Sequence, residues 1–149
     1  MKKYFFVVIV FTLLKVNAQE NSFYGELGGA GPIFSLNYER EVIDDSALLL
    51  RIGLGYLSTW SYEGLTIPIG AYHLIDLNKG NHLELGGSYT FGLGRDNDIG
   101  TGFFLPAIGY RKYKEGRKGF FKITFNPVLY NDEPIEVIPW GGISYGVRF

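Results

Sequence analysis

The last twelve residues of the chain, IPWGGISYGVRF, alternate between large apolar side chains and small or polar ones. The apolar set is Ile143, Tyr145, Val147 and Phe149. The interleaved set is Gly142, Ser144, Gly146 and Arg148. Successive side chains of a β-strand point to opposite faces, so this segment predicts a strand with one apolar face and one small, polar face. Such a strand needs an apolar medium on one side and a narrow polar space on the other.

The same two-residue period recurs along most of the chain, between segments rich in turn-forming residues. The predicted strands are 23–29, 33–41, 46–57, 64–75, 81–92, 101–113, 119–130 and 138–149. The segments 64–75 and 101–113 alternate less clearly, and each contains a proline that lacks a ladder donor, Pro68 or Pro106.

Residues 23–41 are ambiguous, because Gly-Ala-Gly-Pro at 29–32 either separates two short strands or kinks one long strand. The total is then eight strands or seven. Bacterial single-chain barrels use even strand numbers, so we favour eight. The expected fold is all-β, an eight-stranded antiparallel up-and-down barrel that spans a membrane.

The N-terminus has the pattern of a secretory signal peptide. Lys2 and Lys3 precede an apolar run at 4–14, and Val-Asn-Ala at 16–18 forms a small-residue cleavage site. We expect a signal peptide at 1–18, cleaved near Ala18, and a barrel domain at 19–149. A membrane anchor is the alternative, but a spanning helix needs about 20 apolar residues. The chain has no cysteine, which excludes a disulfide scaffold, a thiol nucleophile and a lipid-anchored lipoprotein.

Composition narrows the class further. Removal of Lys2, Lys3 and Lys15 reduces the 14 basic residues to 11, against 15 acidic ones, so no basic surface for nucleic acid is expected. Charged residues make up 19% of the chain, below the roughly 25% of soluble domains. Low charge with 21 glycines and 17% aromatic residues favours a membrane barrel. A soluble barrel of the lipocalin type is the alternative, and it would hide apolar residues inside.

The connections between the predicted strands differ in length. The short ones, 42–45, 76–80 and 114–118, are expected on the periplasmic side, and the longer ones, 58–63, 93–100 and 131–137, on the outside. Aromatic residues near the strand ends predict two belts at the membrane interfaces. The outer belt would hold Trp60, Tyr62, Phe91, Tyr130 and Trp140. The inner belt would hold Phe23, Tyr38, Tyr110, Phe121 and Phe149.

An ordered set of segments extends this picture over nearly all of the mature chain: ELGGAG, SLNYER, RIGLGY, LTIPIGAYHL, LELGGS, PAIGYR and PWGGISYGVRF. It resembles small uncharacterised outer-membrane β-barrels of Bacteroidota-type bacteria, which are similar in architecture to the OmpA/OmpX-type eight-stranded barrels. The resemblance implies a bacterial outer-membrane location among lipid and lipopolysaccharide. It also implies that the barrel-assembly machinery reads the terminal stripe Ile143, Tyr145, Val147 and Phe149. It brings no assigned activity, and we expect a monomer.

The polar stripes predict a charged lumen. Seven residues would point inward: Glu26, Glu39, Arg51, Glu84, Arg111, Lys122 and Arg148. An eight-stranded barrel is just wide enough for side chains to fill it, and buried charges must pair. Three acids against four bases are close to balance. We therefore expect a structural ion-pair network that closes the lumen, with a narrow porin-like pore for small solutes, ions or protons as the alternative.

Two enzyme types resemble this size of barrel, the lipid A palmitoyltransferase and the lipid A deacylase. Both need a histidine beside a serine or an acid. The chain has His73 and His82. His82 shares a face with Glu84 but follows a periplasmic turn, and His73 has no serine two residues on. We therefore predict no catalytic residue and no cofactor.

The outward loops are acidic: Glu63, Asp96, Asp98, Asp132, Glu133 and Glu136. Asp-Asn-Asp at 96–98 falls short of the six or more oxygen ligands of a calcium site, so no metal site is predicted. The predicted role is a structural or surface-interaction scaffold that presents short acidic loops. The alternatives are an outer-leaflet lipid A-modifying enzyme and a narrow pore.

Overall fold

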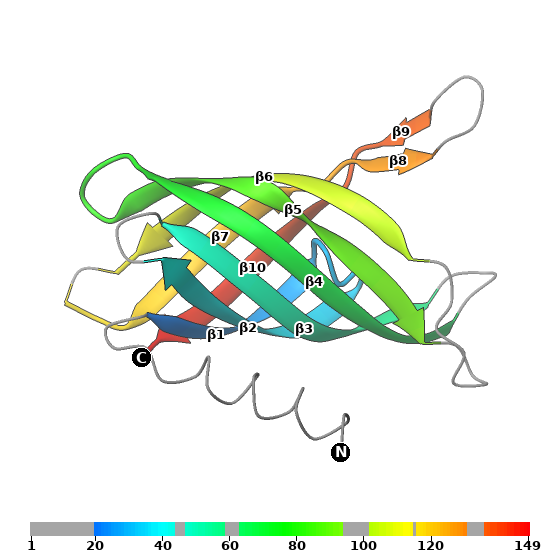
Figure 1. The fold of residues 1–149 in the computed structure, drawn as a ribbon, viewed down its shortest axis with the longest axis horizontal. Helices are drawn as coiled ribbons and strands as arrows, with labels where there is room; N and C mark the ends of the chain where they lie inside the picture. The colour runs from blue at the N-terminus through cyan, green and yellow to red at the C-terminus, as the bar shows by residue number, and fades with distance from the viewer. Residues whose placement is uncertain (1–19, 44–46, 59–62, 94–101, 115, 131–135) are drawn as a thin grey trace, which may run out of the picture.

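Residues 20–43, 47–58, 63–93, 102–114, 116–130 and 136–149 are described by the computed structural model. The predicted signal peptide at 1–18 lies outside these ranges. Within them, eight strands form one closed barrel (Figure 1). They are β1 (Asn21–Gly28), β2 (Phe34–Ile43), β3 (Leu48–Ser58), β4 (Glu63–Asp76), β5 (Asn81–Leu93), β6 (Phe103–Tyr113), β7 (Gly119–Phe125) and β10 (Gly141–Arg148). A search of the same ranges finds no helix long and apolar enough to cross a bilayer.

Every barrel strand pairs antiparallel with its neighbours, and β1 closes the barrel against β10. The seam runs to the end of the chain, because Phe149 N donates to Asn21 O at 2.9 Å and Asn21 N donates to Phe149 O at 3.2 Å. Residues 23–41 form two strands, which resolves the ambiguity in favour of eight. The predicted all-β, eight-stranded antiparallel fold is confirmed.

The two faces of the barrel wall have opposite chemistry. Large apolar side chains are exposed on the outside of every barrel strand, with Leu27 and Phe104 each 56% exposed and Tyr145 67%. The inward-facing stripes bury carboxylates, guanidinium groups, hydroxyls and amides. A soluble barrel has the reverse arrangement, so the soluble alternative is wrong. An apolar wall around a polar interior is the arrangement of a barrel that spans a membrane.

The predicted strand 119–130 is interrupted. β7 ends at Phe125, and Val128–Tyr130 forms β8, which pairs with β9 (Glu136–Ile138) in a separate two-stranded sheet beyond the barrel (Figure 1). The register nevertheless continues: Phe125 pairs with Gly141, Asn126 N donates to Trp140 O, and Val128 pairs with Ile138. Pro127 therefore lies opposite Pro139, and neither can donate a ladder hydrogen bond. The paired prolines divide one long hairpin into a barrel part and a projecting part.

The two prolines that weakened the strand predictions both lie inside barrel strands. Pro68 is in β4, and Pro106 is in β6 opposite Gly87 of β5. The β3–β4 ladder has pairs at Ile52–Ile69 and Gly55–Thr66 but none between them, next to Pro68. Each proline thus removes one backbone hydrogen-bond donor from the sheet, and the strand register on either side of it stays the same.

The inner aromatic belt lies on the outside of the barrel near the end where β1 begins. Phe23, Tyr110, Phe121 and Phe149 are exposed there. The hydroxyl of Tyr110 donates to Asn81 Oδ1 at 2.6 Å, and the hydroxyl of Tyr38 donates to Asn21 Oδ1 at 2.7 Å. These tyrosines place a ring on the apolar wall and a polar tip toward water. Of the outer belt, Trp140 is exposed at the opposite rim, while Trp60, Tyr62 and the Tyr130 side chain lie outside the described part.

Candidate functional site

The lumen contains a layer of buried ion pairs. On one side, Arg51 of β3 pairs with Glu26 of β1, and both side chains are almost fully buried. Arg51 also donates from Nε to Asn37 Oδ1 at 3.0 Å and from Nη1 to the Tyr72 hydroxyl at 3.3 Å. Ser35 and Ser144 donate their hydroxyls to the Glu26 carboxylate, each at 3.3 Å. This pair is held by neighbours from three further strands, β2, β4 and β10.

A second group of charges crosses the lumen. Arg111 of β6 donates two hydrogen bonds, at 2.6 and 3.0 Å, to Glu39 of β2, which is the strand opposite in the barrel order. Arg111 Nη2 also lies 2.6 Å from Glu84 Oε2, and Lys122 Nζ lies 3.1 Å from Glu84 Oε1. All four side chains have no exposed surface. Charge-assisted contacts therefore join strands on opposite walls.

The buried charges balance. Among the residues that the structure describes, the buried charged side chains are three acids and three bases: Glu26, Glu39, Glu84, Arg51, Arg111 and Lys122. Six of the seven predicted lumen residues are thus brought together. Arg148 is not with them: it lies at the inner rim, pairs with Glu20 at 2.6 Å and stacks on the Tyr113 ring. The alternation of side chains predicted the face of β10 on which Arg148 lies, but not its depth in the barrel. Because β10 ends at Arg148, the side chain lies at the rim.

Aromatic rings fill the space between the charges. Lys122 Nζ lies 4.5 Å from the centre of the Tyr24 ring and 5.4 Å from that of Tyr72. The Arg111 guanidinium lies 4.8 Å from the centre of the Phe120 ring, which packs edge-on against Tyr24. Such cation–π contacts stabilise desolvated cations. Tyr24, Tyr72 and Phe120 are each about 1% exposed, so little room is left around the charges.

The turn between β1 and β2 folds into the outer end of the lumen. Residues 29–32 form this plug turn, and Gly29, Ala30 and Gly31 are all buried. The Ala30 carbonyl accepts a hydrogen bond of 2.8 Å from Thr90 Oγ1 of β5, the strand opposite β1. The Gly29 carbonyl accepts one of 3.0 Å from Trp140 Nε1. The plug turn therefore spans the lumen from wall to wall.

Glycine is required in the plug turn for two reasons. Gly29 has φ +68°, and a Cβ there would lie 2.5 Å from the Glu26 carboxyl carbon. A Cβ on Gly31 would collide with the Ser35 side chain. Sequence reasoning identified the turn as a tight hairpin but missed its inward course. The run of small residues at 29–31 is compatible with an inward turn but does not specify one.

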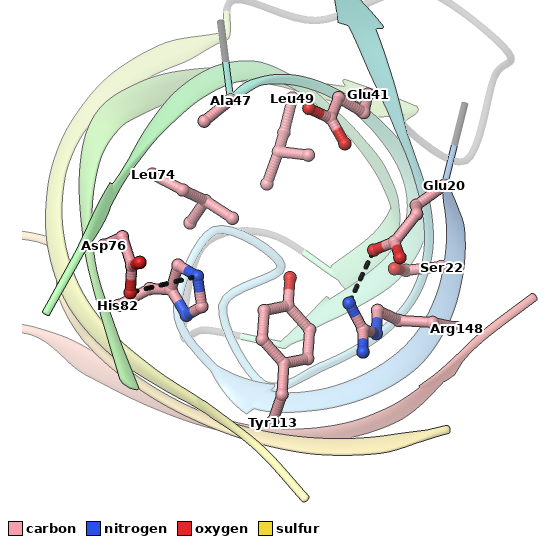
Figure 2. A pocket seen from close by; sticks show the side chains of 10 residues that line it. All are labelled: Glu20, Ser22, Glu41, Ala47, Leu49, Leu74, Asp76, His82, Tyr113 and Arg148. Atoms are coloured by element: carbon pink, nitrogen blue, oxygen red, sulfur yellow. Dashed lines mark hydrogen bonds and ion pairs between the residues drawn. The ribbon is translucent and has the colours of Figure 1, made fainter. Parts of the chain in front are cut away.

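A small open pocket lies at the inner mouth of the barrel (Figure 2). Its volume is about 160 Å³, and His82, Tyr113, Leu49 and Arg148 are among its lining residues. His82 Nε2 lies 3.9 Å from Asp76 Oδ1, and the His82 ring packs edge-on against Tyr113. Figure 2 shows the pocket's only labelled serine on the other side of Tyr113 from His82.

The second histidine does not share this pocket. His73 lies on the outer wall, where it pairs with Leu48 and Leu85 in the sheet. Among the serines that the structure describes, none is hydrogen-bonded to either histidine in the interactions given above. Among the described residues, no group of three or more His, Asp or Glu side chains could hold a metal ion.

The predicted assembly stripe lies on the lipid-facing wall. Ile143, Tyr145, Val147 and Phe149 are between 46% and 67% exposed. Gly142, Ser144 and Gly146 lie on the buried face of the same strand. Recognition of this stripe by the assembly machinery stays a prediction.

A comparison with solved structures finds the N-terminal β-barrel domain of OprF from Pseudomonas aeruginosa. The match has a TM-score of 0.53 and 14% sequence identity, and it covers 88% of this chain and 96% of the OprF chain. No protein-family model and no curated protein matches the chain. At this identity the likeness shows the fold, which is the predicted OmpA/OmpX-type eight-stranded architecture.

Proposed function

We propose that the protein is a bacterial outer-membrane scaffold whose lumen is closed and whose function lies in the segments it presents at the outer surface. The observation that carries the proposal is the double closure of the lumen. The plug turn fills the outer end, and the Arg111–Glu39 pair crosses the barrel nearer the inner end. The likeness to the OprF barrel domain supports the outer-membrane location.

A balanced ion-pair layer favours a structural core over a conduction path. Each of the buried bases lies against at least one buried carboxylate, at 2.6 to 3.1 Å in the cross-lumen group. Moving a permeant ion through this layer would require these pairs to separate in a low-dielectric space, which costs several kcal/mol. The tyrosine and phenylalanine rings further narrow the passage.

The projecting hairpin is the part that the scaffold would present. β8 and β9 extend past the barrel rim (Figure 1), and Val137 and Ile138 are about half exposed there. Binding residues are commonly held on loops that a rigid scaffold positions. Lipopolysaccharide around the outer wall, contact with the assembly machinery and a monomeric state are part of the same proposal.

Planar-bilayer recording of purified, folded protein tests the closed lumen. Wild type should show no steady conductance. The double variant Glu39→Ala with Arg111→Ala removes the pair that crosses the lumen but keeps Glu84 with Lys122, and small conductance steps should appear. The matched control, Glu20→Ala with Arg148→Ala, removes the pair at the inner rim and should stay silent. Large, steady channels in wild type would overturn the proposal.

Deletion of residues 128–138 tests the presented hairpin. Because Pro127 and Pro139 already face each other, the deletion should leave a folded, heat-modifiable barrel. Cells with this variant should lose any cell-surface interaction that cells with the wild-type protein show and cells without the protein lack. An unchanged surface phenotype in this variant would contradict the scaffold role of the hairpin.

A further inference from the structure

A notch interrupts the lipid-facing wall near the inner end of β6, β7 and β10. Lys112, Phe121 and Tyr145 form one row across the three strands, because Phe121 pairs with both of its neighbours. In the next row toward the barrel end, Lys114 N donates to Gly119 O at 3.0 Å, and Gly119 pairs with Val147. Gly119 has no side chain, so this second row has a gap.

The gap coincides with an open hollow in the wall. It has a volume of about 290 Å³ and is lined by Lys112, Lys114, Gly119, Phe120, Phe121 and Tyr145. The Tyr145 hydroxyl lies 3.2 Å from the position that a Cβ on Gly119 would occupy. The notch is thus lined by two lysine side chains, by Tyr145 with its hydroxyl and by the apolar edge of the wall.

The notch lies at the level of lipid headgroups. Lys112 follows Tyr110 of the inner aromatic belt by two residues on the same face, one step nearer the end of the barrel. Figure 1 places the β6–β7 turn at the end where β1 begins and β10 ends. Long basic side chains at this depth direct their charge toward the headgroup region.

The charge around the notch is positive. Four of the seven residues from 112 to 118 are lysine or arginine. Lys114 also lines an adjoining open groove of about 410 Å³, together with Arg117 and Lys118. Among the described residues, no carboxylate pairs with Lys112 or Lys114. Within the described residues, which leave out Glu115, both ammonium groups are therefore available to an anion.

We propose that this notch binds the headgroup of an anionic phospholipid in the inner leaflet. The phosphate would accept hydrogen bonds from Lys112 and Lys114, and an acyl chain would run along Phe121 and the apolar wall toward mid-membrane. Anionic headgroups are recognised by basic pockets at membrane interfaces, and the combination with an apolar wall selects a lipid over a free phosphate. The proposal rests on the membrane orientation given above, but not on a closed lumen.

Native mass spectrometry of the mature protein in detergent, with equal amounts of phosphatidylglycerol and phosphatidylcholine, tests this site. Wild type should retain one phosphatidylglycerol with about a tenfold preference, because each lysine near an anionic headgroup contributes roughly fivefold at most. Lys112→Gln with Lys114→Gln should remove the preference. Lys79→Gln, in the β4–β5 turn at the same end, is the matched control and should keep it.

A variant that fills the notch distinguishes a binding site of defined shape from nonspecific electrostatic attraction between the lysines and anionic lipid. Gly119→Leu fills the notch and leaves both lysines in place. Its Cβ would lie 3.2 Å from the movable Tyr145 hydroxyl and at an ordinary van der Waals distance, 3.8 Å, from the Gly146 carbonyl oxygen. It should lose most of the preference and still fold into a heat-modifiable barrel. Glycerol phosphate, which lacks acyl chains, should not displace the retained lipid.

Three results would overturn the site: no preference in wild type, an equal loss in Lys79→Gln, or full retention in folded Gly119→Leu. The bilayer recordings are independent of these variants. A conducting wild type that retains phosphatidylglycerol would refute the closed scaffold alone, and a silent wild type without preference would refute the notch alone.

Discussion

Glu84 and Leu85 are neighbours in β5 and face two different media. Glu84 has no exposed surface and lies between Arg111 and Lys122 in the lumen, whereas Leu85 is 38% exposed on the outer wall. Both regions exclude bulk water, but a charged side chain is stable in the lumen and destabilising on the wall. In the lumen a charge is tolerated because its partners are fixed on neighbouring strands. On the wall no partner exists, and the medium is hydrocarbon.

The difference shows what sets residue choice in a barrel this small. The wall needs only apolar surface of suitable height, so many apolar residues would serve there. The lumen needs matched partners at defined positions, because an eight-stranded barrel leaves its interior side chains in mutual contact. Substitutions in the lumen should therefore be more specific in their effects than substitutions on the wall.

The largest expected effect lies at the β1–β10 seam, because this seam closes the barrel and so both its wall and its lumen depend on it. Deletion of Phe149 removes both the last aromatic side chain of the wall and two backbone hydrogen bonds to Asn21. Secretion should persist, but folded, heat-modifiable protein in the outer membrane should fall to a small fraction of the wild-type amount. Phe149→Tyr keeps the ring and the backbone and serves as the control. Wild-type levels of folded protein from the deletion would refute an assembly role.

Glu84→Ala should be the most damaging single change in the lumen. It leaves Lys122 without its acidic partner in the buried layer, and the free energy of unfolding should fall by about 3 kcal/mol. Urea unfolding in detergent or vesicles, followed by heat-modifiability, measures this. Glu84→Gln with Lys122→Gln restores the charge balance and should recover much of the loss. An equal loss in the double variant would contradict the ion-pair explanation.

Leu85→Lys tests the wall at nearly the same height. A lysine on the lipid face should cost about 2 kcal/mol, less at the interfaces than at the midplane. The same unfolding assay applies, with Leu85→Phe as the apolar control. If the lysine were tolerated without loss, Leu85 would not face hydrocarbon, and the comparison between wall and lumen would fail.

The smallest effect is expected from the histidines, which lie outside the ion-pair layer. His73→Ala with His82→Ala should fold normally, because His73 is on the wall and His82 contacts only Asp76 and Tyr113 among the interactions given above. Cells with this variant, cells without the protein and wild-type cells should share one lipid A mass profile. A changed acyl chain in both the null strain and the double variant would favour an enzyme.

The period-two pattern predicted the face on which each lumen charge lies, and together with the even strand number of bacterial barrels it predicted the eight strands. It was insufficient for depth, which is why Arg148 was grouped with residues that lie nearer the middle of the barrel. It also could not predict that residues 29–32 turn inward, because a turn signal carries no radial direction. Pro127 and Pro139 are visible in the sequence, but their pairing depends on a register that only the closed barrel defines.

The facing prolines have a consequence for how such a protein changes over time. Because they interrupt hydrogen bonding without shifting the register, the projecting hairpin and the barrel behave as separable modules. Equal insertions or deletions in β8 and β9 would lengthen or shorten the hairpin and leave every barrel pair in place. The surface segment is thereby free to diversify, and foreign peptides could be grafted between residues 130 and 136 while the membrane-spanning module stays constant.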